Sequence, residues 1–292
     1  MTSNDQQSGL GPPTVVSDTR VLRELLRVHR AEGRTIGLVP TMGALHDGHL
    51  SLVKQSVAQT DVTVVTIFVN PTQFSPSEDL DQYPRTLDAD LELLATEGAD
   101  LVFFPSIDQI YPHDFSTHVA PPDVGGPLEG RCRPGHFRGV ATIVLKLFNI
   151  APADVAFFGQ KDFQQVRVVQ QMVRDLSVPI RIEVCPIVRE PDGLAMSSRN
   201  RYLTGDERGR ATALIHCLER ASDLVRQGHH DSTELLAEMR SVLQAAGIER
   251  IDYVALVDPE TMTDVERVTD DTMALVAAYI GETRLIDNCQ IG

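Results

Sequence analysis

The feature that most constrains the fold is a run of β-branched and apolar residues, VTVVTIFV, at positions 62–69. β-Branched residues favour strands, and the run lacks the polar alternation of a strand with one wet face. A strand of this kind is covered on both faces, as in a parallel sheet that carries helices on both sides. The run therefore predicts a layered α/β fold.

Strand-like and helix-like segments alternate around this run. Short apolar segments predict further strands at 35–39, 101–104, 155–158 and 180–188. Apolar residues at helical spacing predict helices near 21–29, 50–57, 87–96, 140–150 and 166–176. The β–α–β–α order predicts a Rossmann-like, doubly wound parallel sheet.

The pattern changes near residue 190. Thr204 and Glu207 form a T-x-x-E capping box, which predicts a helix start. Two amphipathic helices follow, and then three strand-like runs at 251–257, 273–280 and 283–286. We therefore expect a flexible tail at 1–13, a Rossmann-like domain at 14–188 and a smaller C-terminal α+β lid domain at 189–292.

Charge and cysteine usage exclude several classes of protein. The chain has 26 Lys and Arg against 41 Asp and Glu, a net charge of −15. Binding to nucleic acid or to an anionic membrane usually needs a basic surface, so we expect neither partner. The four cysteines are far apart without a C-x-x-C motif, and residues 1–13 are polar, unlike a signal peptide. These features predict a cytoplasmic protein.

The first candidate site follows the predicted strand at 35–39. The segment PTMGALHDGH (40–49) places His46 and His49 in an H-x-G-H pattern at a strand-to-helix turn. Glycines allow a tight turn, and the free N–H groups and dipole at a helix start favour an anion. Imidazoles can donate hydrogen bonds to phosphate oxygens. A turn with two surface histidines is the alternative, and a zinc site is disfavoured because no third ligand stands at a suitable spacing.

Two more segments point to phosphate binding. Lys161, in FFGQKD (157–162), follows a predicted strand, and open parallel sheets bind ligands at the carboxyl ends of their strands. The segment GLAMSSRN (193–200) combines a glycine, two hydroxyls and Arg199, a natural set for phosphate. The alternatives are a solvated turn lysine and an ordinary polar linker.

Two loops carry polar groups of another kind. FVNPTQF (68–74) presents the amides of Asn70 and Gln73, which can bind a hydroxyl or a carboxylate. RCRPGHF (131–137) forms a local basic cluster on an acidic chain. Loop packing and solubility are the alternative explanations for both.

Together these segments resemble the pantoate–β-alanine ligase (pantothenate synthetase) family of the nucleotidylyltransferase superfamily. The resemblance rests on PTMGALHDGH (40–49), FVNPTQF (68–74), RPGHFRGV (133–140), KLFNI (146–150), FFGQKDFQQ (157–165) and AMSSRNRYL (195–203), in that order, with LIDN (285–288) near the end. It implies the ATP-dependent condensation of (R)-pantoate with β-alanine through a pantoyl adenylate, with release of AMP and pyrophosphate. It further implies Mg²⁺ as cofactor and a homodimer.

The resemblance also assigns residues. His49, His46 and Lys161 would be catalytic. The ATP site would be formed by Met42, Gly43, Ala44, Leu45, His46, Asp47, Gly48, His49, Gly159, Gln160, Lys161, Asp162, Val188, Met196, Ser197, Ser198 and Arg199. Gln73, Gln165, Asn70, Arg133 and His136 would bind the other substrates. The loop at 76–85 and the second domain would close over the site.

Two departures from the family pattern affect these assignments. Gln160 stands where many members have Glu, and 88–90 (Asp-Ala-Asp) is less acidic than in some relatives at the place discussed for Mg²⁺. We therefore leave the metal ligands unassigned. Two other functions stay open: a nucleotidylyltransferase that transfers AMP to another acid, and a nucleotide-binding regulator without chemistry.

Overall fold

The computed structural model describes residues 11–75 and 80–292. Its larger sheet has six parallel strands in the order β1-β4-β3-β2-β5-β6. They are β1 (Thr14–Val16), β2 (Ile36–Thr41), β3 (Val62–Ile67), β4 (Leu101–Phe103), β5 (Val155–Gly159) and β6 (Arg181–Cys185). The prediction of a doubly wound parallel sheet is confirmed, and β3 is buried over its whole length.

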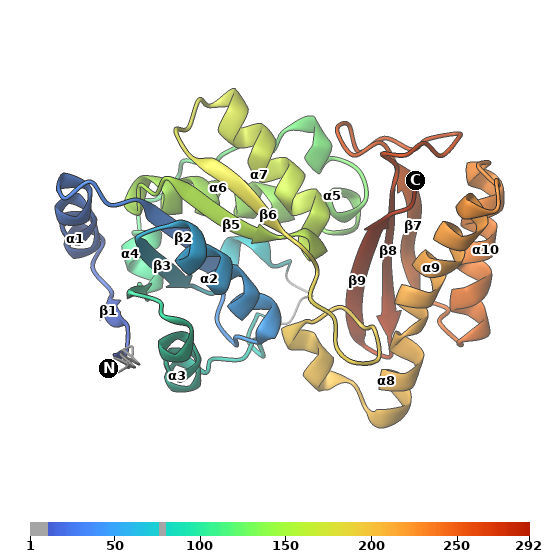
Figure 1. Ribbon diagram of the computed structural model, residues 1–292, viewed down its shortest axis with the longest axis horizontal. Helices are drawn as coiled ribbons and strands as arrows, with labels where there is room; N and C mark the ends of the chain where they lie inside the picture. Colours follow the sequence, from blue (N-terminus) through green and yellow to red (C-terminus); the bar gives the residue numbers. More distant parts are fainter. Residues whose placement is uncertain (1–10, 76–79) are drawn as a thin grey trace, which may run out of the picture.

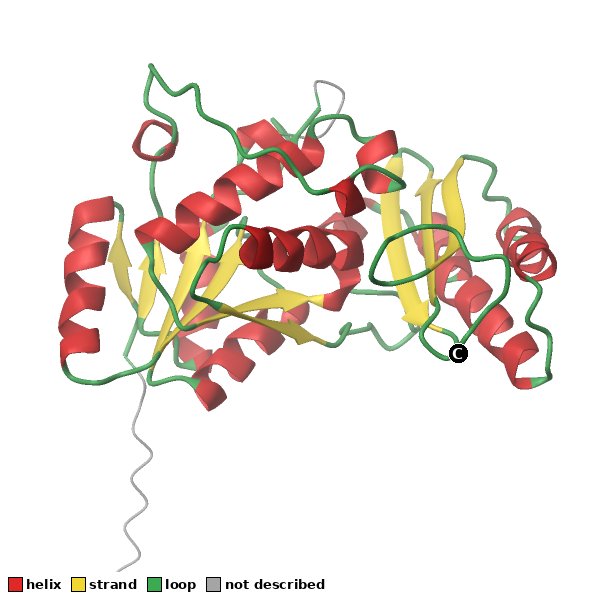
Figure 2. Ribbon diagram, turned by 90° about the horizontal axis from the view of Figure 1, so that it is seen from above, coloured by secondary structure: helices red, strands yellow, loops and turns green. Residues whose placement is uncertain are grey.

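Helices cover both faces of this sheet (Figure 2). Leu38, Val64 and Phe158 join one core with α1 (Thr19–Ala31), α6 (His136–Ile150) and α7 (Phe163–Asp175). The next residue along each of β2 and β3, Val39 and Val65, belongs to a second core with α2 (Asp47–Gln59) and α3 (Leu87–Glu97). This alternation is the two-residue period of a strand that has an apolar layer on each side.

The C-terminal part forms a smaller antiparallel sheet. Its strands are β7 (Ile251–Val257), β8 (Met273–Ile280) and β9 (Thr283–Gln290), in the order β7-β8-β9. It is preceded by α8 (Gly205–Ala211), α9 (Ala213–Arg226) and α10 (Ser232–Ala245), and the capping box of Thr204 and Glu207 is present at α8. Figure 1 shows α9 and α10 on the side of this sheet away from the larger one.

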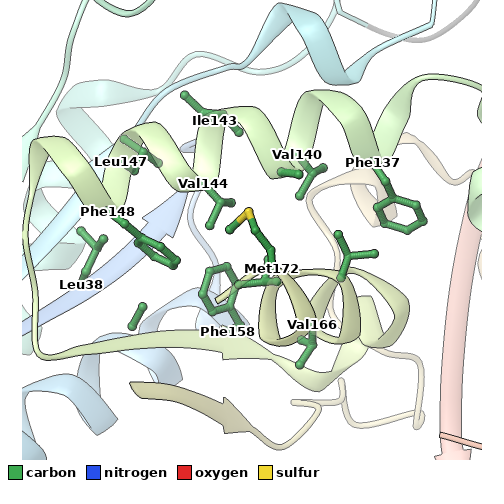
Figure 3. Close-up of a cluster of buried hydrophobic side chains, with 14 of the residues drawn as sticks. Leu38, Phe137, Val140, Ile143, Val144, Leu147, Phe148, Phe158, Val166 and Met172 are labelled. Atoms are coloured by element: carbon green, nitrogen blue, oxygen red, sulfur yellow. The ribbon is translucent and has the colours of Figure 1, made fainter. Parts of the chain in front are cut away.

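The two sheets share apolar packing. One face of the small sheet, including Leu256 and Val276, packs with α9 and α10. The opposite face, including Ala255 and Leu275, joins the core that also contains α6 and α7. Figure 3 shows the centre of that core, where Val144, Phe158 and Met172 meet. The division into 1–13, 14–188 and 189–292 stays a prediction, and residues 1–10 lie outside the described residues.

Several boundaries differ from the prediction. The strand expected at 180–188 ends at Cys185, and β1 was not predicted because it is three residues long with one buried side chain. Val57 and Leu176, the last apolar residues of the predicted helices at 50–57 and 166–176, are 41% and 52% exposed. The stretch 105–134, for which no helix or strand was predicted, holds two short helices, α4 (Ile107–Ile110) and α5 (Glu129–Cys132).

The chain also contains short 3-10 turns. They are η1 (Pro71–Gln73), η2 (Asp123–Gly125), η3 (Gln160–Asp162) and η4 (Ser198–Tyr202). Of these, η1, η3 and η4 follow strands β3, β5 and β6 and carry residues that line a cleft. Among the described residues, no helix has the length and apolar character that crossing a bilayer requires.

Candidate active site

A cleft of about 230 Å³ opens at the carboxyl edge of the parallel sheet. The strand order reverses between β2 and β5, and such a switch point leaves a crevice where ligands bind. Seventeen predicted site residues line the cleft: Met42, His46, Gly48, His49, Asn70, Gln73, Arg133, His136, Gly159, Lys161, Asp162, Gln165, Val188, Met196, Ser197, Ser198 and Arg199. Segments distant in sequence therefore meet at one site.

Five predicted ATP-site residues do not line the cleft: Gly43, Ala44, Leu45, Asp47 and Gln160. Ala44 and Leu45 are buried behind it, and Asp47 faces solvent. Prediction from a contiguous motif included them because a motif does not reveal which of its side chains point inward.

The two histidines stand at the first turn of α2. His46 is the N-cap, and its Nδ1 accepts a hydrogen bond from the Gly48 N–H at 3.1 Å. Nδ1 of the neutral ring therefore carries no proton, and Nε2 is the N–H donor. The His49 ring lies 4.1 Å from the His46 ring, centroid to centroid. A Cβ at position 48 would stand 2.8 Å from His46 Cε1, so this packing requires glycine.

Both imidazoles are neutral at pH 7. Burial first, and then the charges of Lys161 and Arg201, lower the pKa of His46 to about 4. Burial, His46 and Lys161 lower the pKa of His49 to about 3. The pair therefore offers uncharged N–H donors beside the Lys161 ammonium, and an arriving polyanion would find its positive charge chiefly on Lys161 and Arg199.

These depressed pKa values predict that acid weakens the fold. Between pH 6.5 and about 4 the unfolded chain protonates His46 and His49 while the native chain does not, so their contribution to stability is complete above 6.5 and falls as pH decreases. Urea unfolding of the wild type and of a His46→Gln/His49→Gln variant, from pH 7.5 to 5, isolates the effect. The wild type should show the steeper loss, and equal slopes, or an NMR titration of His49 near 6.5, would contradict the prediction.

A buried carboxylate holds the loop that precedes the histidines. Asp90 of α3 is 1% exposed and accepts hydrogen bonds from the N–H groups of Ala44 and Leu45 at 3.0 and 2.9 Å. Asp90 was considered only for Mg²⁺ from the sequence. Its position one turn before Leu94, on the apolar face of the helix, was the signal that it is a buried structural acid.

The loop at 68–74, which carries the amides of Asn70 and Gln73, is held in place by α6. The side chain of Asn70 donates to Gln73 Oε1 at 2.9 Å and to the Gly139 carbonyl at 3.3 Å, and it accepts from Tyr111 Oη at 2.8 Å. A Cβ at Gly139 would lie 2.3 Å from the Thr72 carbonyl oxygen, so η1 can approach α6 this closely only at a glycine. Asn70 therefore orients Gln73 in addition to lining the cleft.

Arg133 and His136 form the next part of the wall. His136 Nδ1 lies 2.8 Å from the Gln73 carbonyl oxygen, which can only accept, so Nδ1 carries the proton. Nε2 then accepts a hydrogen bond from Arg133 Nη1 at 3.1 Å. The guanidinium lies 3.6 Å from the Glu129 carboxylate, which holds it from behind.

The late serine–arginine segment closes the opposite wall. Ser197 is the N-cap of η4 and accepts from the Arg199 N–H at 3.2 Å. The Ser198 hydroxyl donates to the Ala44 carbonyl at 3.1 Å, joining this segment to the loop before α2. Ser198 thus uses its proton within the protein.

An apolar floor was not predicted as part of the site. Val140, Ile143, Val144 and Leu147 of α6, with Phe158 of β5, line the cleft. Their side chains are among those drawn in Figure 3. The sequence identified an apolar helix here, but periodicity cannot distinguish a face that packs on a neighbour from one that lines a cavity. This floor suits the carbon skeleton of a small aliphatic substrate.

The parallel sheet, the helix-start histidines and the lysine and serine–arginine turns at one cleft define the class: a nucleotide-binding α/β enzyme. The chain belongs to the pantoate–β-alanine ligase family, whose model matches residues 14–290. The pantothenate synthetase of Caldicellulosiruptor saccharolyticus is 48% identical over 274 residues, which are 94% of this chain and 98% of that protein. That of Roseiflexus castenholzii is 53% identical over 254 residues, 87% and 91% of the two chains.

Solved structures of proteins from the same family also match this chain. The pantothenate synthetase of Thermus thermophilus matches with a TM-score of 0.91 and 41% identity, covering 95% of this chain and 99% of that one. The pantoate–β-alanine ligase of Francisella tularensis, complexed with β-γ ATP and β-alanine, matches with a TM-score of 0.78 and 34% identity, covering 95% and 97%.

Proposed function

We propose that this chain condenses (R)-pantoate with β-alanine at the expense of ATP, the step that forms pantothenate (vitamin B5) in coenzyme A biosynthesis. The observation that carries the proposal is the convergence of His46, His49, Lys161 and Arg199 on one cleft beside an apolar floor. The family match along residues 14–290 agrees with it.

The first step activates the pantoate carboxylate. A carboxylate oxygen attacks the α-phosphorus of ATP, and the bond from that phosphorus to pyrophosphate breaks. Negative charge grows on the α-phosphate and on the leaving pyrophosphate, so donors fixed in advance lower the barrier. In this role the Nε2–H groups of the two neutral histidines donate to phosphate oxygens, and Lys161 and Arg199 supply the compensating charge.

The second step forms the amide. The amine of β-alanine attacks the acyl carbon, the bond to AMP breaks, and the amine loses a proton. AMP leaves far more readily than oxide would, which is why the adenylate is needed. Gln73 and Gln165 bind the polar groups of pantoate, while the α6 floor excludes water from the reactive acyl adenylate.

The Mg²⁺ expectation stays a proposal, and its ligands stay unassigned. The described residues hold no group of three or more His, Cys, Asp or Glu side chains that could bind a metal ion, and Asp90 is occupied by two backbone N–H groups. Mg²⁺ is usually bound by one or two carboxylates together with substrate phosphates, so it would enter on the phosphates of ATP. We keep Mg²⁺ as a proposal and assign no step to it.

The remaining expectations concern assembly, closure and location. We keep the homodimer and the cytoplasmic location as proposals, which sedimentation and cell fractionation would test. The closing loop at 76–85 falls partly on residues 76–79, outside the described residues.

Product analysis tests the function directly. AMP and pantothenate should form only when ATP, pantoate and β-alanine are all present. Pyrophosphate–ATP exchange should require pantoate but not β-alanine, because the adenylate forms first. Exchange with another acid but not with pantoate would favour a different nucleotidylyltransferase, and ATP binding without exchange would favour a regulator; either result would overturn the proposal.

A further inference from the structure

Strand β9 touches both phosphate-facing walls of the cleft, although it belongs to the other sheet. It is an edge strand of the small sheet and lies nearest the larger one (Figure 1). Its residues Asp287 and Asn288 are each 2% exposed. Neither was assigned a role from the sequence, where LIDN (285–288) was only part of the resemblance.

The Asn288 side chain grips the turn that carries Lys161. Its Nδ2 donates to the carbonyl oxygens of Gln160 at 3.1 Å and of Lys161 at 2.9 Å. Only the NH₂ end of an amide can meet two carbonyls, so the orientation of this amide is determined. Both carbonyls belong to η3, a single 3-10 turn between β5 and α7 that is too short to hold its own geometry.

Asp287 stabilises the opposite wall of the cleft, the one that carries the serine–arginine turn. Its carboxylate accepts two hydrogen bonds from Arg189, at 2.7 and 3.0 Å, and one from the Asn288 N–H at 2.8 Å. Arg189 also donates to the Gly193 carbonyl at 3.0 Å, in the turn that leads to Met196. Two adjacent residues of β9 therefore fix the position of the η3 turn relative to the segment before the serine–arginine turn.

We propose that Asn288 is a positioning residue for Lys161. This inference rests on the proposed function, in which the Lys161 ammonium meets charge on the phosphates. A lysine side chain is long and flexible, so its ammonium is placed correctly only if its backbone is held. Without the Asn288 amide, two carbonyls of η3 lose their partner and the turn shifts. Misplacement of a catalytic group by about 1 Å costs on the order of 100-fold in rate.

A double-mutant cycle tests the proposal on the full-length enzyme. The variants are Asn288→Ala, Lys161→Ala and the two combined, and the readout is the rate of pantoate-dependent pyrophosphate–ATP exchange. Asn288→Ala alone should lose about 10- to 100-fold in kcat. In the Lys161→Ala background the same change should cost little, because its effect acts through the missing ammonium. The KM for β-alanine, which reacts after pyrophosphate has left, should stay close to that of the wild type.

Thr272→Val is the matched control. Thr272 is 1% exposed in the same C-terminal part, and its hydroxyl accepts from the Thr269 N–H at 2.9 Å, away from the cleft. This variant should melt at a lower temperature and keep its kcat. Should Asn288→Ala fail to fold, Asn288→Leu enters the same cycle: it has a similar shape and no charge but lacks the N–H donors, so it should show the same coupling.

The outcomes separate the two proposals. An equal loss of rate from Asn288→Ala in both backgrounds, or no loss at all, would overturn the positioning role of Asn288. The proposed role of Lys161 would be unaffected. A fully active Lys161→Ala variant would overturn the role of Lys161 in the proposed function, and the positioning role with it.

Discussion

Replacing His49 by alanine should lower turnover by about 100- to 1,000-fold, the usual cost of removing one preorganised donor to a developing charge. His49 lines the cleft, and its Nδ1 is buried without a hydrogen-bond partner among the described residues. The part of the ring that faces the cleft is therefore the edge that bears Nε2. This atom can donate to a phosphate oxygen, and the low pKa keeps the ring uncharged until the nucleotide arrives.

Two conservative variants distinguish a donor at Nε2 from simple loss of volume. The amide nitrogen of Gln reaches roughly as far as Nε2, and that of Asn only as far as Nδ1. His49→Gln should therefore recover part of the lost kcat, and His49→Asn should behave like His49→Ala. His113→Ala serves as the control because His113 is exposed and does not line the cleft. Full activity in His49→Ala would contradict the assignment.

Replacing Glu129 by alanine should destabilise the protein by about 3 kcal/mol, since removing one partner leaves a buried charge uncompensated. Glu129 is 6% exposed and accepts two hydrogen bonds from Arg284 of β9, at 2.9 and 2.7 Å. The Tyr253 hydroxyl of β7 donates to the same carboxylate at 2.7 Å. Burial by itself would raise the pKa of Glu129, but the hydrogen bonds and charge of Arg284 outweigh it and lower the pKa.

The expected loss of stability in Glu129→Ala depends on the contacts that Arg284 keeps. Arg284 keeps its contact with Asp252 at 2.7 Å, so the effect should fall at the low end of the range for broken buried pairs. Urea unfolding followed by circular dichroism measures it, and Glu129→Ala/Arg284→Met should recover part of the loss. Glu24→Ala, which breaks an exposed pair with Arg27, should leave stability nearly unchanged. A similar result for Glu129→Ala would show that the pair contributes nothing.

This substitution should also affect the cleft. Glu129 lies 3.6 Å from Arg133, which lines the cleft and contacts His136. Since Glu129 belongs to α5 and Arg284 to β9, the same carboxylate connects the small sheet to the substrate wall. Its removal should therefore raise the KM for substrate as well as weaken the fold.

Local pattern was sufficient for most of the helices and strands and for the segments that meet at the cleft. The run at 62–69 became the fully buried β3, and the capping box of Thr204 and Glu207 begins α8 as expected. These signals depend on near neighbours in the chain: residue period, turn chemistry and the groups that satisfy a helix end. The phosphate-type segments were recognisable for the same reason.

Other features depend on contacts between distant segments. Asp90 holding the loop before α2, Gly139 admitting η1, and Asn288 gripping the Lys161 turn each join segments 45 or more residues apart. The exposure of Val57 and Leu176 was likewise decided by which neighbours came to cover their helices.

Hydrophobic period and turn residues were thus enough to specify most of the helices and strands, their parallel arrangement and the segments that line the cleft. The packing of the two sheets decided which side chains enter the cleft, which polar groups stay behind to hold them, and the neutral state of the two histidines. The reason is physical: burial, close approach and charge proximity belong to the neighbours in space, and a linear pattern does not contain them.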